Sequence, residues 1–353
     1  MQAIESYGYF LVGAGQALER RDFKISSLEA HEAIVEVAGC GLCHTDLGFY
    51  AGHVKTNHEL PLVLGHEISG KVMMAGSDYE TLIGKSVVIP AVLPCGACEL
   101  CKSGRSNVCR AQKMPGNDFN GGFASHIKVP ARFLCVLPEN LGNFEISELS
   151  VIADAVTTPY QSLMRSNLKS GDLAIVVGVG GIGIYMAQLA KDAGATVIAL
   201  DIDDSKLEKA KNAGARFTVN TKGLSDRDTK DSIRMLVKEN NLPKLQWKVF
   251  ECSGTASGQD AAFSLLTYAG TLGVVGFTMD KVSIRLSNMM AFDADLFGNW
   301  GCKPEYYPAV VDKVLQGRIN IRDNIEKRPL VSINETILEA LGHKLLRRVV
   351  LTP

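Results

Sequence analysis

Two short stretches near the start of the chain carry side chains that could bind a divalent metal ion. Cys43 lies in the first stretch and His66 in the second. A thiolate and an imidazole are both good ligands for a borderline-soft cation such as zinc. Acidic residues stand beside them, Asp46 and Glu67, and carboxylates next to a metal site orient its ligands. Either ligand alone would be interpreted as an ordinary core residue, whereas the two together predict a metal site.

A second candidate metal site lies further along the chain. It consists of four closely spaced cysteines, Cys95, Cys98, Cys101 and Cys109. Four thiolates can surround one tetrahedral zinc and leave no open position, so the predicted role is structural. An iron–sulfur cluster also uses four cysteines and is the alternative. Disulfides are disfavoured, because the chain is long and begins without a secretion signal.

A glycine-rich loop in the second half of the chain has the features of a dinucleotide site. It follows an apolar run at residues 173–177 and consists of Gly178, Val179, Gly180, Gly181, Ile182 and Gly183. Between a strand and a helix, such glycines let the backbone approach a pyrophosphate, whose charge the helix N-terminus stabilises. Asp201, at the end of the next predicted strand, could accept hydrogen bonds from ribose hydroxyls and would repel a 2′-phosphate. The sequence therefore predicts NAD rather than NADP.

The elements that position these residues follow two different patterns. Residues 1–90 contain short strand-like runs separated by Gly, Asp and Pro, which indicates a mainly antiparallel β domain. From Asp172 onward, strands and helices alternate, which predicts a parallel sheet covered on both faces. We therefore expect a metal-binding domain at residues 1–153, to which residues 290–353 return, and a dinucleotide domain at residues 154–289.

Composition narrows the functional classes. Of the 353 residues, 46% are hydrophobic and 21% charged, an ordinary globular mixture. The net charge is −1 and no basic tract is present, so neither nucleic acid nor an anionic membrane is an expected partner. No apolar run is long enough to span a membrane, and the N-terminus lacks a secretion signal. These features predict a soluble, cytoplasmic protein.

The pattern Gly-x-x-His-Thr-Asp, followed about twenty residues later by Gly-His-Glu, resembles the zinc-dependent alcohol dehydrogenases of the medium-chain superfamily. The resemblance covers essentially the whole chain. It implies an α/β fold in which a mainly β, GroES-like catalytic domain is joined to a Rossmann domain with a doubly wound parallel sheet. It also implies one structural zinc at the four cysteines and one catalytic zinc.

The same resemblance assigns a third ligand to the catalytic zinc. The matching position, usually cysteine or glutamate in the family, is Asp154, beside Cys43 and His66. Aspartate is a competent oxygen ligand, and three protein ligands leave a fourth position open for a substrate oxygen. Glu67 is a further candidate ligand. The alternative is that Asp154 only caps a turn and that the catalytic metal is absent.

Further roles are carried over from the family to matching positions. Thr45 would accept the alcohol proton, and His44 would lie near the pyrophosphate. The nicotinamide half would be lined by backbone around Val275 and Phe277, and Arg348 would contact the dinucleotide phosphate. Members of the family are commonly dimers or tetramers, so a homodimer or homotetramer is expected.

One family residue is missing from this chain. The distal histidine of the family's proton relay matches Gly48 here, and Tyr50 or His53 could replace it.

The expected reaction is oxidation of a secondary alcohol to a ketone, with hydride transfer to NAD. Three alternatives stay open: a polyol dehydrogenase, a double-bond reductase of the same superfamily, and a non-catalytic NAD-binding scaffold with only the structural zinc.

A narrower resemblance concerns the substrate. Asp154, the following Ala-Val-Thr-Thr-Pro-Tyr segment and residues 297–305 resemble the 6-hydroxycyclohex-1-ene-1-carbonyl-CoA dehydrogenases of anaerobic benzoyl-CoA degradation. Those enzymes oxidise a ring hydroxyl beside a double bond and give the 6-oxo thioester and NADH. An apolar wall that includes Trp300 would suit a ring better than a polyol, whose hydroxyls need polar partners. Binding of a CoA thioester rests on this resemblance alone.

Overall fold

The computed structural model describes residues 3–353, which divide into two compact units. Unit 1 contains the chain through Thr157 together with Gly301–Gly317 and Ile321–Pro353. Unit 2 contains Thr158–Trp300 and Arg318–Asn320. Within residues 3–353, no helix combines the length and apolarity needed to cross a bilayer.

Unit 1 is built on two β-sheets. A three-stranded sheet has the order β2-β1-β4, and a seven-stranded sheet has the order β15-β16-β3-β5-β6-β8, with β7 also paired to β3. All of these pairs are antiparallel except β15 with β16. The strands are β1 (Ile4–Leu11), β2 (Glu19–Ile25), β3 (Glu32–Gly41), β4 (Leu62–Val63), β5 (Glu67–Ala75), β6 (Ser86–Ile89), β7 (His126–Pro130), β8 (Cys135–Val136), β15 (Ile325–Pro329) and β16 (Arg348–Thr352). The predicted mainly β domain is therefore present.

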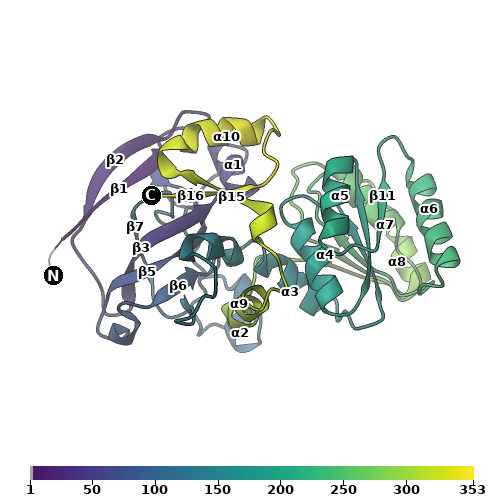
Figure 1. Ribbon diagram of the computed structural model, residues 1–353, viewed down its shortest axis with the longest axis horizontal. Helices are drawn as coiled ribbons and strands as arrows, with labels where there is room; N and C mark the ends of the chain where they lie inside the picture. The colour runs from purple at the N-terminus through teal and green to yellow at the C-terminus, as the bar shows by residue number, and fades with distance from the viewer. Residues whose placement is uncertain (1–2) are drawn as a thin grey trace. The chain divides into compact units, whose positions relative to one another are not determined.

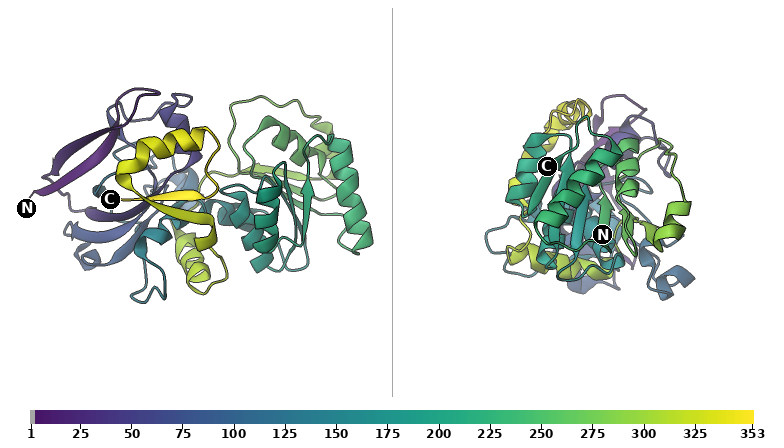
Figure 2. Two further views of the ribbon diagram at one scale, coloured as in Figure 1. Left: turned by 45° about the horizontal axis from the view of Figure 1, so that its top comes forward. Right: turned by 90° about the vertical axis from the view of Figure 1, so that its right-hand side faces the viewer.

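Short helices connect and cover these sheets. The α-helices of unit 1 are α1 (His44–Tyr50), α2 (Glu99–Lys102), α9 (Tyr307–Leu315) and α10 (Ile333–Leu341). Its 3₁₀ helices are Glu80–Leu82, Ser106–Val108, Ile146–Ala153, Pro304–Tyr306, Arg322–Asn324 and Leu330–Ser332. The C-terminal strand β16 pairs with β3, so the yellow end of the chain lies among the earliest elements in Figure 2. The β domain is thus completed by residues from the far end of the sequence.

Unit 2 has the doubly wound parallel sheet that the sequence predicts. Its strand order is β11-β10-β9-β12-β13-β14, and every pair is parallel. The strands are β9 (Leu173–Val177), β10 (Thr196–Asp201), β11 (Phe217–Asn220), β12 (Lys248–Glu251), β13 (Thr271–Val274) and β14 (Asp295–Gly298). The strand order reverses at β9, and ligands of such sheets bind at the carboxyl ends of the strands beside this point.

The helices of unit 2 lie on both faces of this sheet. They are α3 (Thr157–Arg165), α4 (Gly183–Asp192), α5 (Asp204–Asn212), α6 (Asp226–Glu239), α7 (Ala256–Ser264) and α8 (Ser287–Phe292). Figure 1 shows α4 and α5 on one face and α6 and α7 on the other. All five residues of β9 are buried, as expected for a strand covered on both sides.

Two helix starts differ from the sequence-based expectation. The Thr158-Pro159 pair predicts a helix beginning at Pro159, but α3 begins at Thr157. Asparagine is favoured at helix N-caps, so the sequence predicts that Asn334 caps a helix, but it lies inside α10, whose N-cap is Ser332. The side chain of Asn334 instead accepts from the backbone N–H of Leu18 and donates to its carbonyl. This distant partner fixes the orientation of Asn334.

The glycine loop gives a test of this architecture. A Cβ at Gly183 would lie 1.9 Å from the backbone oxygen of Gly178. Gly183→Ala should therefore destabilise the protein by about 1–3 kcal/mol, more than the helix propensity of alanine returns. A Cβ at Gly180 would meet no atom within 4 Å, so Gly180→Ala is the matched control, with an expected change within about 0.5 kcal/mol. Urea unfolding measures both, and equal stability of the two variants would contradict this account.

Candidate active site

Unit 1 brings Cys43, His66 and Asp154 together. Cys43 caps the N-terminus of α1, His66 directly precedes β5, and Asp154 follows the 3₁₀ helix Ile146–Ala153. Oδ2 of Asp154 lies 3.7 Å from the Cys43 sulfur and 3.6 Å from Nε2 of His66. Together with a carboxylate oxygen of Glu67, these ligand atoms all lie within 4.8 Å of one another. The side chains predicted to bind the catalytic metal therefore converge.

Asp46 contacts both Cys43 and His66 and orients them. Its carboxylate is 2% exposed and accepts hydrogen bonds from the backbone N–H groups of Cys43 and Gly65, at 2.9 and 3.1 Å. Its Oδ1 also lies 3.3 Å from Nδ1 of His66. A carboxylate at the far nitrogen of a histidine ligand is the usual arrangement that fixes the ring at a metal.

Glu67 and Arg348 form a buried ion pair beside the cluster. Their side chains are 0% and 6% exposed, and Nη1 of Arg348 lies 2.6 Å from Oε1 of Glu67. Burial raises the pKa of Glu67 to about 7, although the positive charge of Arg348 opposes the shift. Arg348 also donates to the carbonyl of Leu42 at 3.4 Å. The contact of Arg348 with a dinucleotide phosphate stays a prediction.

The geometry and charge of the cluster fit zinc. Around a tetrahedral zinc, neighbouring nitrogen, oxygen and sulfur ligands lie about 3.3–3.8 Å apart, and Oδ2 of Asp154 lies within this range of both the Cys43 sulfur and Nε2 of His66. Burial lowers the pKa of His66, but Asp46, Cys43 and Asp154 together raise it well above its usual value. The surroundings thus favour positive charge on the imidazole, and a divalent cation bound by the same groups would supply that charge.

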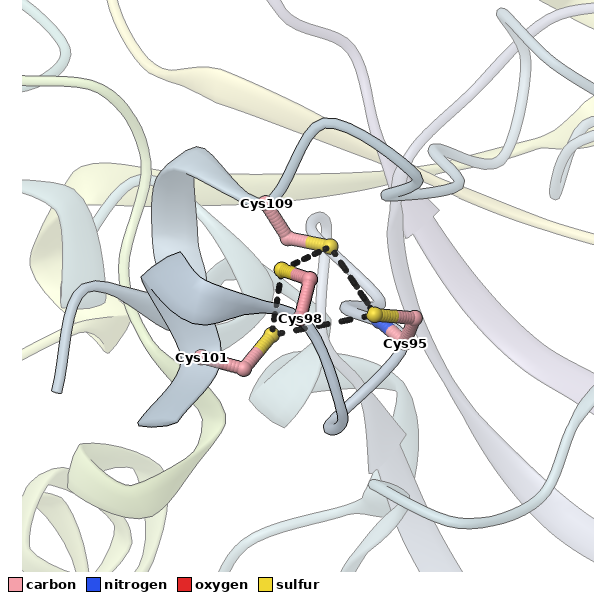
Figure 3. Close-up of side chains that lie close together, drawn as sticks. All are labelled: Cys95, Cys98, Cys101 and Cys109. Atoms are coloured by element: carbon pink, nitrogen blue, oxygen red, sulfur yellow. Dashed lines mark hydrogen bonds between the residues drawn. The ribbon is translucent and has the colours of Figure 1, made fainter. Parts of the chain in front are cut away.

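The four cysteines form a second cluster, shown in Figure 3 with their thiols directed at one another. Cys98 lies 3.5 Å from Cys101 and 3.6 Å from Cys109, while Cys95 lies 3.5 Å from Cys109 and 4.0 Å from Cys101, sulfur to sulfur. Four thiolates around one zinc lie about 3.8 Å apart. In a 4Fe–4S cluster each cysteine binds a different iron, and in a 2Fe–2S cluster two cysteines bind each iron, so sulfurs on different irons would lie further apart. The spacing favours zinc.

The local backbone prepares this cluster for a cation. N–H groups of Ala97 and Cys98 lower the pKa of Cys95 to about 6, which favours the thiolate that a metal requires. Burial instead raises the pKa of Cys101 to about 12, so this thiol would lose its proton only on binding the metal. The 3₁₀ helix between Cys101 and Cys109 is also attached elsewhere in unit 1, because Ser106 donates to the Glu305 carboxylate at 3.2 Å. All nine cysteines of the chain are free thiols, and disulfides are absent from residues 3–353.

The candidates for proton transfer lie on or after α1. Thr45 is exposed, and its hydroxyl oxygen lies 3.8 Å from the Cys43 sulfur, so it can reach a molecule bound beside the cluster. His44 is exposed as well. Tyr50 is buried and donates to the carbonyl of Gly15 at 3.3 Å, whereas His53 is exposed. Of the two suggested replacements for the relay histidine, His53 is therefore the more accessible.

Unit 2 gathers the predicted dinucleotide residues at the carboxyl edge of its sheet. Gly178 directly follows β9 with φ of 83°, a conformation that favours glycine. Gly180 leaves open space where a side chain would stand, and Gly183 begins α4 after Gly181 and Ile182. Space above a helix N-terminus is what a pyrophosphate requires.

Asp201 has a second role that sequence reasoning missed. Its carboxylate accepts backbone N–H groups of Val179, Ile202 and Asp203 at 3.0, 2.8 and 3.1 Å. It therefore holds the glycine loop in place. A carboxylate can accept about four hydrogen bonds, so capacity remains for a ribose hydroxyl.

Glu251, at the end of β12, was also missed. It is fully buried, and its Oε1 accepts backbone N–H groups of Ser253 and Gly254 at 2.7 and 3.1 Å. Gly254 lies against the backbone of Phe277, which is exposed, and the N–H of Val275 donates to the carbonyl of Glu251. The segments predicted to line the nicotinamide half are thus held side by side. The position of Glu251 at a strand end was the available signal.

Known protein families match both halves of the chain. The alcohol dehydrogenase GroES-like domain family matches residues 29–139, and the zinc-binding dehydrogenase family matches residues 181–316. The two matches cover the catalytic half and the dinucleotide half in the expected order.

Individual relatives cover almost the whole chain. An alcohol dehydrogenase of Geobacillus stearothermophilus is 29% identical over 341 residues, which are 95% of this chain and 96% of that protein. A D-arabitol-phosphate dehydrogenase of Enterococcus avium is 28% identical over 320 residues, 89% and 88% of the two chains. The structure of galactitol-1-phosphate dehydrogenase from Escherichia coli shares the fold, with a TM-score of 0.88 at 22% identity over 98% of this chain and 100% of that one. The chain belongs to the zinc-type medium-chain alcohol dehydrogenases.

Proposed function

We propose that the protein oxidises a secondary alcohol to a ketone at the Cys43–His66–Asp154 cluster and transfers the hydride to NAD. The observation that carries this proposal is the convergence of one thiol, one imidazole and one carboxylate at zinc-ligand spacing. Double-bond reductases of the superfamily generally lack this ligand set. We also propose that the protein is cytoplasmic and that it forms a homodimer or homotetramer.

The residues divide the chemistry between them. Cys43, His66 and Asp154 would hold the zinc, which as a Lewis acid lowers the pKa of an alcohol. Asp46 keeps the imidazole of His66 in its orientation. The exposed hydroxyl of Thr45 is placed to take the alcohol proton, because it lies beside Cys43 and is not enclosed by other side chains. The glycine loop and Asp201 would bind NAD, which accepts the hydride.

For the substrate we propose 6-hydroxycyclohex-1-ene-1-carbonyl-CoA, which would give the 6-oxo thioester. Support comes from the resemblance of residues 297–305 and of the Asp154 segment to that group of dehydrogenases. The side chain of Trp300 is 51% exposed, so a large apolar surface is available in this segment for a ring. Oxidation of an allylic alcohol gives a conjugated ketone, which favours release of hydride.

A phosphorylated polyol is the second candidate. It is favoured by the relative from Enterococcus avium, which is named for D-arabitol phosphate and aligns over 89% of this chain. Both candidates carry phosphate groups, but only the cyclic thioester offers an apolar ring at the reacting carbon. The two candidates therefore differ in the polarity that the substrate site must provide.

The first prediction concerns metal content. The wild-type protein should hold two zinc ions per chain, and Asp154→Ala should hold one and lose turnover while its circular dichroism stays unchanged. Elemental analysis of purified protein gives the count. The control is Asp118→Ala, which removes another half-buried carboxylate of unit 1 and should leave two zinc ions. A fully active wild type with a single zinc would refute the assignment.

The second prediction concerns the dinucleotide. In Asp201→Ala, loss of the ribose interaction should cost NAD about 1.5–3 kcal/mol of binding energy. NADP should lose less, because the repulsion of its 2′-phosphate disappears as well. The measurement is kcat/KM with each cofactor. An equal loss for both cofactors would leave the NAD preference unchanged. That result would show that Asp201 only holds the glycine loop and that its assignment to the ribose is wrong.

The third prediction concerns the substrate. The value of kcat/KM should be highest for the cyclic hydroxyenoyl-CoA, compared with free cyclohex-2-enol, sorbitol and D-arabitol phosphate. A free alcohol that matches the thioester would remove the CoA assignment and leave the dehydrogenase assignment intact. Preference for D-arabitol phosphate would select the second candidate.

A further inference from the structure

The backbone just before Asp154 has an unusual environment. The 3₁₀ helix Ile146–Ala153 ends there, and Asp154 leaves the helical conformation with φ of −142° and ψ of −56°. The last carbonyl groups of a helix lack partners within it and must find them elsewhere. The carbonyl of Ala153, one of these groups, is fully buried with its residue. Whatever satisfies this carbonyl also sets the direction in which the chain enters Asp154.

Tyr307 supplies the shortest bond to that carbonyl. Its hydroxyl donates to the Ala153 oxygen at 2.5 Å and accepts the backbone N–H of Ala91 at 3.2 Å. Thr157 donates to the same oxygen at 3.3 Å, a weaker contact. The side chain of Tyr307 is 0% exposed, and burial raises the pKa of its phenol well above its usual value. The hydroxyl therefore keeps its proton and remains a donor.

We propose that Tyr307 is a positioning residue that fixes Asp154 at the catalytic metal through the carbonyl of Ala153. The proposal rests on the proposed function, because it takes Asp154 as a zinc ligand. Tyr307 lies at the start of α9, 154 residues after the carbonyl that it binds. It touches neither the cluster nor the glycine loop by any described hydrogen bond, so its effect passes through the backbone.

Two features distinguish this role from that of an ordinary core tyrosine. The hydroxyl bonds to two backbone segments, one before Asp154 and one at Ala91, so a change in its position would move both. The N–H of Ala91 also donates to the Ala153 oxygen itself, at 3.4 Å, which is the longest of the three contacts to that oxygen. The segment at Ala91 leads directly into the first cysteine of the four-cysteine cluster, Cys95. Removal of the hydroxyl leaves the buried carbonyl of Ala153 with only weaker donors. This loss disfavours the present backbone conformation at the end of the 3₁₀ helix, just before Asp154.

The test is Tyr307→Phe, which removes the hydroxyl and keeps the ring. Zinc affinity of the Asp154 site, measured by competition with a chromophoric chelator, should fall about tenfold or more, as for other residues that support metal ligands. The four-cysteine zinc should be retained. After Co²⁺ substitution, the visible absorption of the Cys43–His66–Asp154 site should change, because a displaced carboxylate alters the ligand field. A role in stability alone would leave that spectrum unchanged.

Tyr185→Phe is the matched control. Tyr185 is 1% exposed and lies in unit 2, so the variant loses a buried hydroxyl remote in sequence from Asp154 and should keep wild-type zinc affinity. If Tyr307→Phe proves unstable, Thr157→Val removes the weaker donor to the same carbonyl and should weaken zinc a few-fold.

Wild-type zinc affinity and an unchanged cobalt spectrum in Tyr307→Phe, or unchanged affinity in Thr157→Val where that variant is needed, would overturn the proposal. A failure of the proposed function gives a different result. In that case the wild type itself would hold one zinc, and Asp154→Ala would lose none.

Discussion

Several acidic groups that are buried together require positive charge close by. This requirement governs the arrangement of side chains around the proposed metal site of unit 1. Cys43, Asp46, Glu67 and Asp154 surround one imidazole in a region from which water is largely excluded. Isolated buried charges are costly, and partners must be close to offset the loss of hydration. Arg348 supplies one positive charge within the protein. The remaining negative charge favours a bound divalent cation.

The two proposed binding sites are built from different parts of the chain. Unit 1 uses side chains from separate strands and helix ends, because a metal needs ligands from several directions. Unit 2 uses backbone, since the carboxyl ends of parallel strands bring loops and a helix N-terminus to one edge. Asp201 and Glu251 have equivalent tasks there: each ends a strand and holds the next loop through backbone N–H groups.

Local patterns made much of this structure predictable. The glycine loop, the four cysteines and the pair Cys43 and His66 are defined by neighbours in sequence, and Asp154 followed from family resemblance. The contacts that support them could not be predicted, because they join distant residues. Glu67 and Arg348 are separated by 281 positions. Asn334 was misassigned for the same reason, since propensity favours a cap whereas its partner is Leu18.

The return of the chain to unit 1 has a consequence for biosynthesis. Ribosomes release the N-terminal segment first, and most domains fold as soon as they have emerged. Unit 1 cannot do so, because α9 and β16 are made only after residues 158–300 of unit 2. A nascent chain that stalls in the dinucleotide half would thus present metal-binding side chains without the segments that enclose them. Completion of translation, rather than emergence of the ligands, sets the moment at which the metal site closes.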